Sequence, residues 1–374
     1  MSLRSDSERG AGRNGTGGGP KWGLLLGVLV PLALLGLLSP LLRERFSGRD
    51  DAGGQPEPFS YTQGAGQLFR CAGSGLAAVS ASEARLLDQN GKLVFRQALS
   101  FETPALFTSE TGALFCDIGG AGCYSADIDG ASRVLRPEGD ILTAHRNREG
   151  WAALVTEEPG YKAKVTVYDP EGKAKFAWWS GSGYVLRACV SPENRLLAVL
   201  CGAKGGGALH LFRLDSEEEL ASASFPGELP FDLAFQGEDR LWTLSASGLN
   251  VLDTAGTLLN RFDFSGSALA DYSLEGQDFA ALWLENGAGG GTLTTLDRDG
   301  SPLGSLDLEE TGLSLSAAGR RLLVTAAGGW TLYDRNLSPL ASEETALSTR
   351  LALLRNDGDV LLLSAYAAER VRAG

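Results

Sequence analysis

The side chains that most often carry out chemistry are scarce in this chain. Its only two histidines, His145 and His210, lie 65 residues apart in stretches that alternate like β-strands. A catalytic triad or a histidine-rich metal site needs such residues in one place, so the pattern argues against both. The motifs G-x-S-x-G, H-E-x-x-H and G-x-x-x-x-G-K-S/T are also missing. We therefore expect no metal, no cofactor and no catalytic residues.

Carboxylates are abundant, and seven aspartates recur with an average spacing of 41 residues: Asp88, Asp127, Asp169, Asp215, Asp253, Asp297 and Asp334. Two of these stretches, 127–130 and 297–300, are short acidic loops that could suggest calcium. A full calcium loop needs more ligands and a late bidentate glutamate, and both stretches lack that spacing. We favour a structural interpretation of the aspartates.

In that interpretation each aspartate builds a turn by accepting a hydrogen bond from a backbone N–H two residues later. Five copies have a glycine three residues after the aspartate, where it can adopt a positive φ. Asp215 and Asp334 have Glu218 and Leu337 at that place, so we expect their turns to differ.

The sequence around the turns predicts the architecture, because a forty-residue repeat made of strands indicates β-propeller blades. Seven four-stranded units are followed by strand-like segments at 350–354, 360–365 and 369–371, one strand short of another blade. Residues 57–62 precede the first blade without a partner there. Because open sheet edges are unfavourable, we predict an all-β, eight-bladed β-propeller that this N-terminal strand closes. Seven blades with a loose tail is the alternative.

Longer connections between the second and third strands of a blade are expected at 157–162, 202–207 and 285–291. They should share a face with the links between blades, opposite the aspartate turns, and loops on a rigid scaffold often bind partners. Six aromatic or basic residues near the first loop are our candidate binding residues: Tyr161, Lys162, Lys164, Trp178, Trp179 and Tyr184. The alternative is that both tryptophans pack between blades as core.

The five cysteines form no C-x-x-C pair. Cys116 and Cys123 flank Gly119-Gly120-Ala121-Gly122 and are expected to face each other across a hairpin, either as a disulfide or as buried thiols. Cys189 and Cys201 should be out of register with each other, so we do not pair them.

The N-terminus predicts a membrane anchor. We predict that residues 1–21 are a disordered cytoplasmic tail. Residues 22–42 form an uncharged apolar run that is long enough for a transmembrane helix. Residues 43–56 are then a linker to the propeller at 57–374. The run is longer than a signal peptide core and has no good cleavage site, which favours an uncleaved signal anchor. Four basic residues before the span and three after it favour a cytoplasmic N-terminus, with an extracytoplasmic propeller. The net charge of −13 argues against a nucleic-acid partner.

The stretches Thr156–Lys162, Trp179–Leu186 and Leu332–Arg335 resemble an uncharacterised family of single-pass, membrane-anchored propellers from Gram-positive, clostridia-like bacteria. The resemblance covers most of residues 57–369 and implies a bacterial membrane protein with no known activity. The Tyr168-Asp169-x-x-Gly172-Lys173 turn also resembles quinoprotein-like propellers more distantly, but their adjacent-cysteine pair and cofactor ligands are missing. The structural histidine and Trp-Asp signature of WD repeats are missing as well.

We therefore expect a non-catalytic binding or scaffold module of the bacterial cell envelope, held in the cell membrane, whose partner is a protein or the cell wall. One alternative is a hydrolase or lyase that uses carboxylates in the central funnel, and another is an assembly factor for envelope proteins.

Overall fold

The computed structural model describes residues 59–60, 66–287, 289–310, 312–344, 351–364 and 367–372, which belong to the unit Pro56–Gly374. The predicted tail, transmembrane helix and linker lie outside the described residues. Within the described ranges, no helix is long and apolar enough to cross a membrane.

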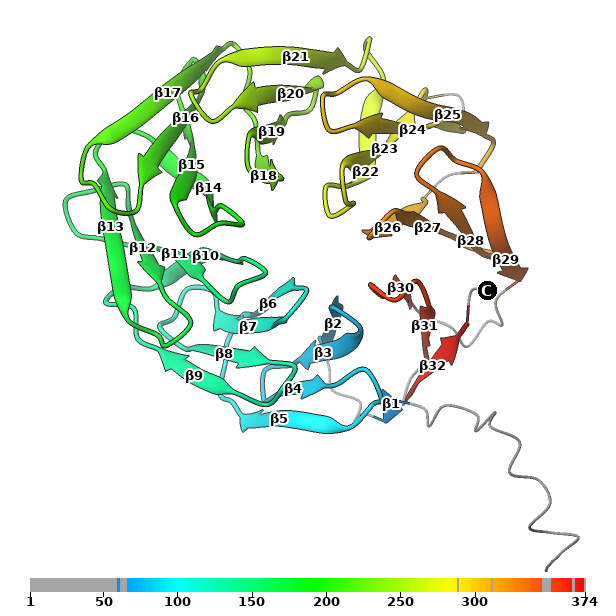
Figure 1. Ribbon diagram of the computed structural model, residues 1–374, viewed down its shortest axis with the longest axis horizontal. Coiled ribbons are helices and arrows are strands. Elements are labelled where there is room, and N and C mark those ends of the chain that lie inside the picture. The colour runs from blue at the N-terminus through cyan, green and yellow to red at the C-terminus, as the bar shows by residue number, and fades with distance from the viewer. Residues whose placement is uncertain are drawn as a thin grey trace, which may run out of the picture. The chain divides into compact units, whose positions relative to one another are not determined.

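The described strands form eight four-stranded antiparallel sheets arranged as the blades of a ring (Figure 1). From the axis outward, blade one contains β2 (Leu68–Ala72), β3 (Gly75–Val79), β4 (Glu83–Leu87) and β5 (Leu93–Ala98), and blade two contains β6 (Pro104–Ser109), β7 (Gly112–Asp117), β8 (Cys123–Asp127) and β9 (Ser132–Leu135). In the same direction, blade three contains β10 (Ile141–Arg146), β11 (Ala152–Thr156), β12 (Ala163–Tyr168) and β13 (Ala174–Ser180), and blade four contains β14 (Tyr184–Val190), β15 (Leu196–Ala203), β16 (Gly206–Arg213) and β17 (Glu219–Pro226).

The remaining four blades follow in the same order around the ring. Blade five contains β18 (Asp232–Gln236), β19 (Arg240–Leu244), β20 (Gly248–Asp253) and β21 (Leu258–Asp263), and blade six contains β22 (Ala268–Ser273), β23 (Phe279–Glu285), β24 (Gly291–Asp297) and β25 (Pro302–Leu308). Blade seven contains β26 (Ser314–Ala318), β27 (Arg321–Ala326), β28 (Gly329–Asp334) and β29 (Pro339–Glu344), and blade eight contains β30 (Leu351–Leu354), β31 (Val360–Leu363), β32 (Ala367–Val371) and β1 (Phe59–Ser60).

Blade eight combines the two ends of the propeller, as the sequence predicts. β1 pairs with β32 in the register Phe59↔Ala368 and Ser60↔Ala367. Phe59 is buried in a cluster that joins blade eight to blade one and includes Leu76 and Leu361. The guanidinium of the buried Arg355 lies 5.5 Å from the Phe59 ring centroid. The eight-bladed prediction is confirmed, and the seven-bladed alternative is wrong.

The core of the propeller lies between blades. Eight hydrophobic clusters occupy the eight junctions of the ring, and β3 and β11 are buried at every residue. The outer strands are largely exposed, as in β9 and β29. This gradient follows from the architecture, because neighbouring blades cover both faces of each inner strand and such strands become continuously apolar.

Hydrogen bonds also join every pair of adjacent blades. They run from Gly73 N to Ser109 O (3.1 Å), Ile141 N to Gly120 O (2.8 Å), Asn147 Nδ2 to Ser191 O (2.9 Å), Arg187 Nε to Asp232 Oδ1 (2.7 Å), Gln236 Nε2 to Leu274 O (3.1 Å), Leu315 N to Asp271 Oδ2 (2.8 Å), Leu354 N to Ser316 Oγ (3.4 Å) and Asn356 N to Gly73 O (3.2 Å). Apolar packing is non-directional, so these directional bonds help to set how each blade sits against the next.

The aspartate turns link the third and fourth strands of their blades. Asp88, Asp253, Asp297 and Asp334 each accept backbone N–H bonds from two and four residues later, at 2.8–3.0 Å. The predicted turn is thereby confirmed. Our expectation that the Asp334 turn differs is wrong, because Leu337 adopts a φ of 63° where other copies have glycine.

Two aspartates have other roles. Asp215 differs as expected, since its carboxylate bonds both Nε and Nη2 of Arg213 at 2.9 Å. Asp127 binds the buried Arg146 of the next blade, and Asp129 accepts the backbone bond from Ala131 instead.

Candidate functional site

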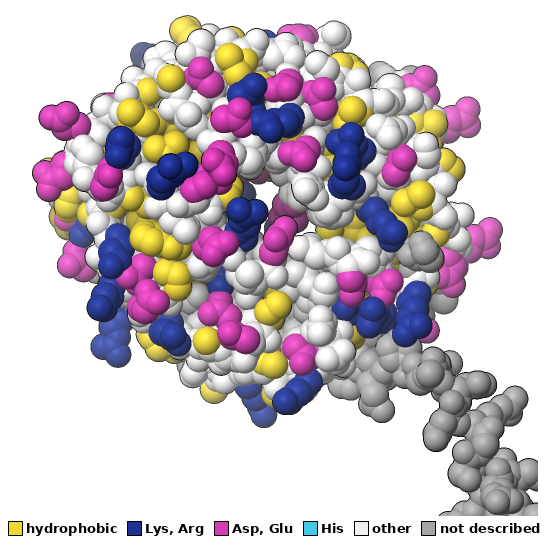
Figure 2. All heavy atoms as spheres, in the orientation of Figure 1, with side chains coloured by type: hydrophobic (Ala, Val, Ile, Leu, Met, Phe, Trp, Pro, Cys, Tyr) yellow, Lys and Arg dark blue, Asp and Glu magenta, His cyan; other side chains and the backbone are white. Residues whose placement is uncertain are grey.

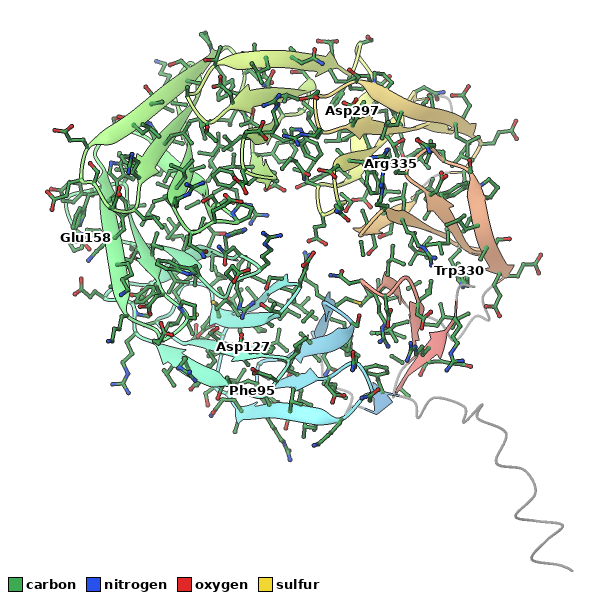
Figure 3. All side chains as sticks on the ribbon, in the orientation of Figure 1. Phe95, Asp127, Glu158, Asp297, Trp330 and Arg335 are labelled. Carbon is green, nitrogen blue, oxygen red and sulfur yellow. The ribbon has the colours of Figure 1, made fainter. Side chains whose placement is uncertain are left out.

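The loops around blade three bring most of the predicted binding residues together. The connection 157–162 joins β11 to β12, and the residues between β13 and β14 lie beside it, because Lys162 N donates to Ser180 O at 2.8 Å. Figure 3 labels Glu158 of this connection at the outer side of the ring. Both segments therefore leave the blade on the same face, as the sequence predicts.

Five of the six candidates form a surface that we call the blade-three patch: Tyr161, Lys162, Lys164, Trp179 and Tyr184. Trp179 lies opposite Lys164 in the β12–β13 register, and Lys164 Nζ is 5.2 Å from a Trp179 ring centroid. The Tyr161 ring centroid is 6.4 Å from that of Trp179, and Lys162 Nζ is 4.9 Å from the Tyr184 ring centroid. The three aromatic residues stay accessible, with exposed fractions of 51%, 41% and 62% for Tyr161, Trp179 and Tyr184.

Trp178 does not belong to the patch. Successive side chains of a strand point to opposite faces, so Trp178 faces blade four while Trp179 faces away from it. Its ring centroid lies 5.2 Å from that of Phe212 and 5.5 Å from that of His210, within the apolar cluster between blades three and four. The core interpretation is thus right for Trp178, and the exposed interpretation is right for Trp179.

The two lysines of the patch differ in their electrostatic surroundings. Lys164 forms an ion pair with Glu138, and that hydrogen bond and charge lower the pKa of the Glu138 carboxyl. For Lys162, by contrast, no carboxylate lies within ion-pair distance among the described residues. It presents an exposed positive charge beside Tyr184 on a protein whose net charge is −13.

Sequence reasoning missed an apolar extension of the same face. Leu229 and Phe231, in the link from blade four to blade five, are 52% and 40% exposed. A Cβ at Gly202 would meet Leu229 Cδ1 at 2.8 Å, and Gly202 pairs with Tyr184 across β14 and β15, so Leu229 lies close to the patch. Phe231 continues this apolar edge to Tyr272, with ring centroids 5.9 Å apart. The available signal was the apolar triplet Leu229-Pro230-Phe231 directly before β18.

The prediction of a long loop at 202–207 is wrong, because this segment also contacts the link from blade four to blade five. β15 and β16 continue through most of it and leave a two-residue turn, Lys204–Gly205. The glycines permit close contact rather than flexibility, because a Cβ at Gly207 would meet Pro230 Cδ at 2.7 Å. In blade six, the expected 285–291 connection does occur, between β23 and β24.

The central opening is lined by charged side chains of both signs (Figure 2). Asp232 near the axis is 8% exposed and accepts bonds from Arg187, from the Tyr272 hydroxyl at 2.9 Å and from its neighbour Leu233 N. Asp271 bonds the backbone N–H groups of Tyr272 and Leu315. These two carboxylates therefore hold blades four to seven together. The alternative of a hydrolase or lyase in the central funnel needs carboxylates that are available to a substrate.

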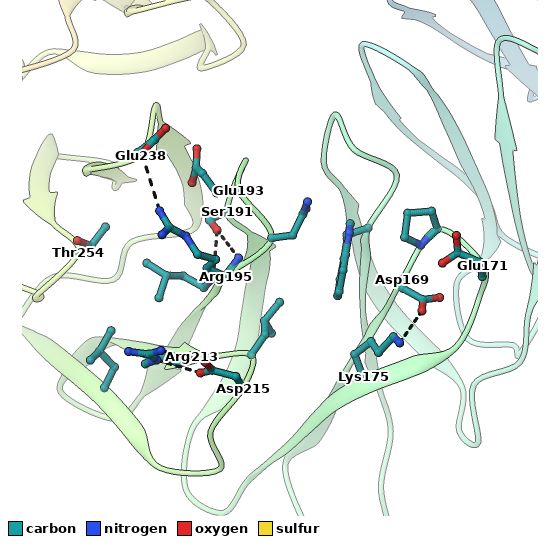
Figure 4. Close-up of a pocket in the computed structure, with 16 residues that line it drawn as sticks. Asp169, Glu171, Lys175, Ser191, Glu193, Arg195, Arg213, Asp215, Glu238 and Thr254 are labelled. Carbon is teal, nitrogen blue, oxygen red and sulfur yellow. Dashed lines mark hydrogen bonds and ion pairs between the residues drawn. The ribbon is translucent and has the colours of Figure 1, made fainter.

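A groove of about 830 Å³ lies on the opposite face, among blades three, four and five (Figure 4). Its charged walls are largely paired within the protein: Lys175 with Asp169 at 2.9 Å, Arg213 with Asp215 at 2.9 Å, and Arg195 with Glu238 at 3.8 Å. Burial alone would raise the pKa of Asp169, but hydrogen bonds from Lys173 N and Lys175 lower it overall. Because these charges already have partners, the blade-three patch is the stronger candidate site.

The comparisons with known proteins agree with this fold. Residues 60–209 match the model of a family of unknown function (DUF5711). No curated protein matches the chain. BamB from Moraxella catarrhalis is similar in structure, with 14% identity, a TM-score of 0.51, and coverage of 82% of this chain and 96% of BamB.

Two further solved structures are similar at the same level. The C-terminal WD40 domain of Sif2 has 14% identity and a TM-score of 0.54, with 85% of this chain and 94% of that domain covered. Dihydro-heme d1 dehydrogenase NirN has 15% identity and a TM-score of 0.53, with 76% and 67% covered. At such low identities the similarity establishes the β-propeller fold and leaves the function to the residues of this chain.

Proposed function

We propose that this protein is a non-catalytic binding module that captures a protein partner through the blade-three patch. The observation that carries the proposal is the accessibility of three aromatic side chains grouped around two lysines, on a propeller whose other Trp in the same strand is packed into the core. Large exposed aromatic residues that cluster with cations are typical of binding hot spots.

The chemistry of the patch favours a protein surface that combines acidic and apolar groups. Lys162 offers a positive charge with no ion-pair partner among the described residues, and the aromatic rings offer apolar area that is costly to leave in water. Leu229 and Phe231 enlarge that area toward blade five. A partner with carboxylates set among aliphatic or aromatic side chains would complement both features.

We also propose that the module works outside the cytoplasm, in the envelope of a bacterium. The support is the uncharged run 22–42 with its slight basic bias on the N-terminal side. An anchored propeller would be confined near the membrane, where a partner in the same envelope meets it at high effective concentration.

A photo-crosslinking residue placed at position 179 in the full chain tests the binding proposal in living cells. We expect one crosslinked protein, identified by mass spectrometry, that is not obtained from position 340, where Leu340 of blade seven is 50% exposed. Tyr161→Ala and Lys162→Glu should each weaken the purified complex about tenfold or more, as loss of a hot-spot contact does.

The control is Leu340→Ala, which removes a similarly exposed side chain far along the ring. Equal weakening by Leu340→Ala, or unchanged affinity in both patch variants, would exclude the patch as the binding surface. Denaturation curves of each variant show whether lost binding reflects lost folding.

A further inference from the structure

Cys116 and Cys123 lie opposite each other on the neighbouring strands β7 and β8 of blade two. Their Sγ atoms are 2.9 Å apart, and both residues are almost completely buried, at 0% and 1% exposed. Both are thiols in this structure. Sequence reasoning left open whether they form a disulfide, and the strand register bears on that question.

The hydrogen bonds of the hairpin define the kind of pair that the cysteines occupy. Asp117 N donates to Gly122 O at 2.9 Å and Ile128 N donates to Thr111 O at 3.0 Å, so these opposite residues are hydrogen-bonded pairs. Such pairs alternate with non-hydrogen-bonded pairs along an antiparallel ladder, which puts Cys116 and Cys123 in a non-hydrogen-bonded pair. The Cα separation there, about 4.5 Å, falls within the range of disulfides.

The other three cysteines have no comparable neighbour in their sheets. Cys71 pairs with Leu76, Cys189 with Ala198, and Cys201 with Val185 on one side and Ala208 on the other. The Cys189 thiol donates to Leu233 O at 3.4 Å. One pair in the described propeller therefore has a geometry suited to a covalent link.

We propose that Cys116 and Cys123 are a disulfide-forming site that links β7 to β8, with a low-molecular-weight or protein disulfide as the oxidant. One cysteine thiolate attacks a sulfur of the oxidant and forms a mixed disulfide. The second thiolate then attacks the cysteine sulfur of that intermediate. The oxidant leaves as two thiols, having taken up two electrons and the two protons that the cysteines lost.

Burial determines when this step can occur. Leu114, Ile141 and Leu154 enclose the pair in the cluster between blades two and three. Burial raises the pKa of the Cys116 thiol well above its ordinary value, which depletes the reactive thiolate. Oxidation therefore belongs to the stage at which the β7–β8 hairpin exists but blade three does not yet cover it. Once the blades have packed, the same burial protects the link from reductants.

The test determines the redox state of each cysteine in the full chain isolated from producing cells. Free thiols are blocked with N-ethylmaleimide in denaturant at lysis, and disulfides are then reduced and labelled with iodoacetamide. We expect iodoacetamide on Cys116 and Cys123 and N-ethylmaleimide on Cys71, Cys189 and Cys201. The mass of the intact, unlabelled chain should be two hydrogen atoms below that of the fully reduced chain. A mass gain from a small-molecule adduct would contradict the internal link.

Refolding separates the chemistry of the pair from the location of the protein. The reduced, unfolded full chain is refolded in detergent with oxidised and reduced glutathione and labelled in the same way. N-ethylmaleimide on all five cysteines in both experiments overturns the proposal. An oxidised pair after refolding but a reduced pair in cells supports the site and contradicts the extracytoplasmic location instead.

The variant Cys116→Ala/Cys123→Ala gives an independent readout. Refolding the wild-type chain with a reductant in place of oxidised glutathione should lower its Tm, whereas the double variant should melt at the same temperature after either treatment. Cys189→Ala, which removes a buried thiol without a cysteine opposite it, should keep the wild-type difference. A wild-type Tm that is identical after both treatments contradicts the proposal.

Discussion

Trp178 and Trp179 are adjacent in β13, yet alternation along the strand gives them opposite surroundings. We predict that Trp178→Ala lowers the free energy of unfolding by about 2–3 kcal/mol, below the full cost for a completely buried tryptophan because Trp178 is partly exposed. Trp179→Ala should change it by less than about 1 kcal/mol. Urea denaturation of the two variants measures both values, and equal losses would contradict these assignments.

His145 makes stability depend on pH. Its Nδ1 is buried without a hydrogen-bond partner in the described structure, and burial together with the nearby Arg187 charge lowers its pKa to about 4. The unfolded chain takes up this proton near pH 6.5, whereas the folded chain takes it up only near pH 4. The contribution of His145 to the free energy of unfolding is therefore fully present above pH 6.5. It is lost as the pH falls toward 4, by up to about 3 kcal/mol.

Denaturation midpoints of the wild type and His145→Asn between pH 7 and pH 4 check this prediction. The wild type should lose more stability than the variant over that range, since the other titrating groups are shared. The same comparison with His210→Asn, the only other histidine, shows whether the effect belongs to His145. Parallel pH curves for the wild type and His145→Asn would be inconsistent with a lowered pKa of His145 in the folded chain.

At the scale of elements, β1 is the shortest of the described strands and completes blade eight. We predict that a chain starting at residue 56 keeps the stability of the propeller, whereas one starting at residue 66 loses about 3 kcal/mol or more, because it lacks the buried Phe59 and exposes the edge of β32. Thermal melting of the two chains checks this. Similar melting temperatures would mean that blade eight closes without β1.

Sequence reasoning succeeded for elements where a local rule controls the structure. The forty-residue period and the aspartate turns located the blades, because an Asx turn depends on residues only two to four positions apart. It failed at 202–207, where the glycines serve contacts with Leu229 and Pro230 from the next link. It also could not orient Trp178 and Trp179, since the register that assigns each side chain to a face depends on pairing with β12.

At the scale of the whole molecule, the chain combines an acidic propeller with an uncharged N-terminal run. We predict that protease added to intact cells digests the propeller and leaves a short N-terminal fragment, which antibodies to tags at each end detect. A cytoplasmic protein serves as the control for intact cells. Full protection of the propeller, with digestion only after lysis, would contradict an extracytoplasmic location.

The closure of blade eight has a consequence for biosynthesis. Phe59 pairs with Ala368, more than 300 residues later in the chain. At about 5–20 residues per second, a ribosome needs roughly 15–60 s to make that partner after Phe59 has been added. Throughout this interval the nascent propeller is an open arc, and no adjacent blade yet covers the apolar surfaces of the first blade and of the blade made most recently. The C-terminal strands of blade eight, which are translated long after blade one, thus shield blade one. A translational pause before β32 would prolong the period in which the arc is prone to misassembly.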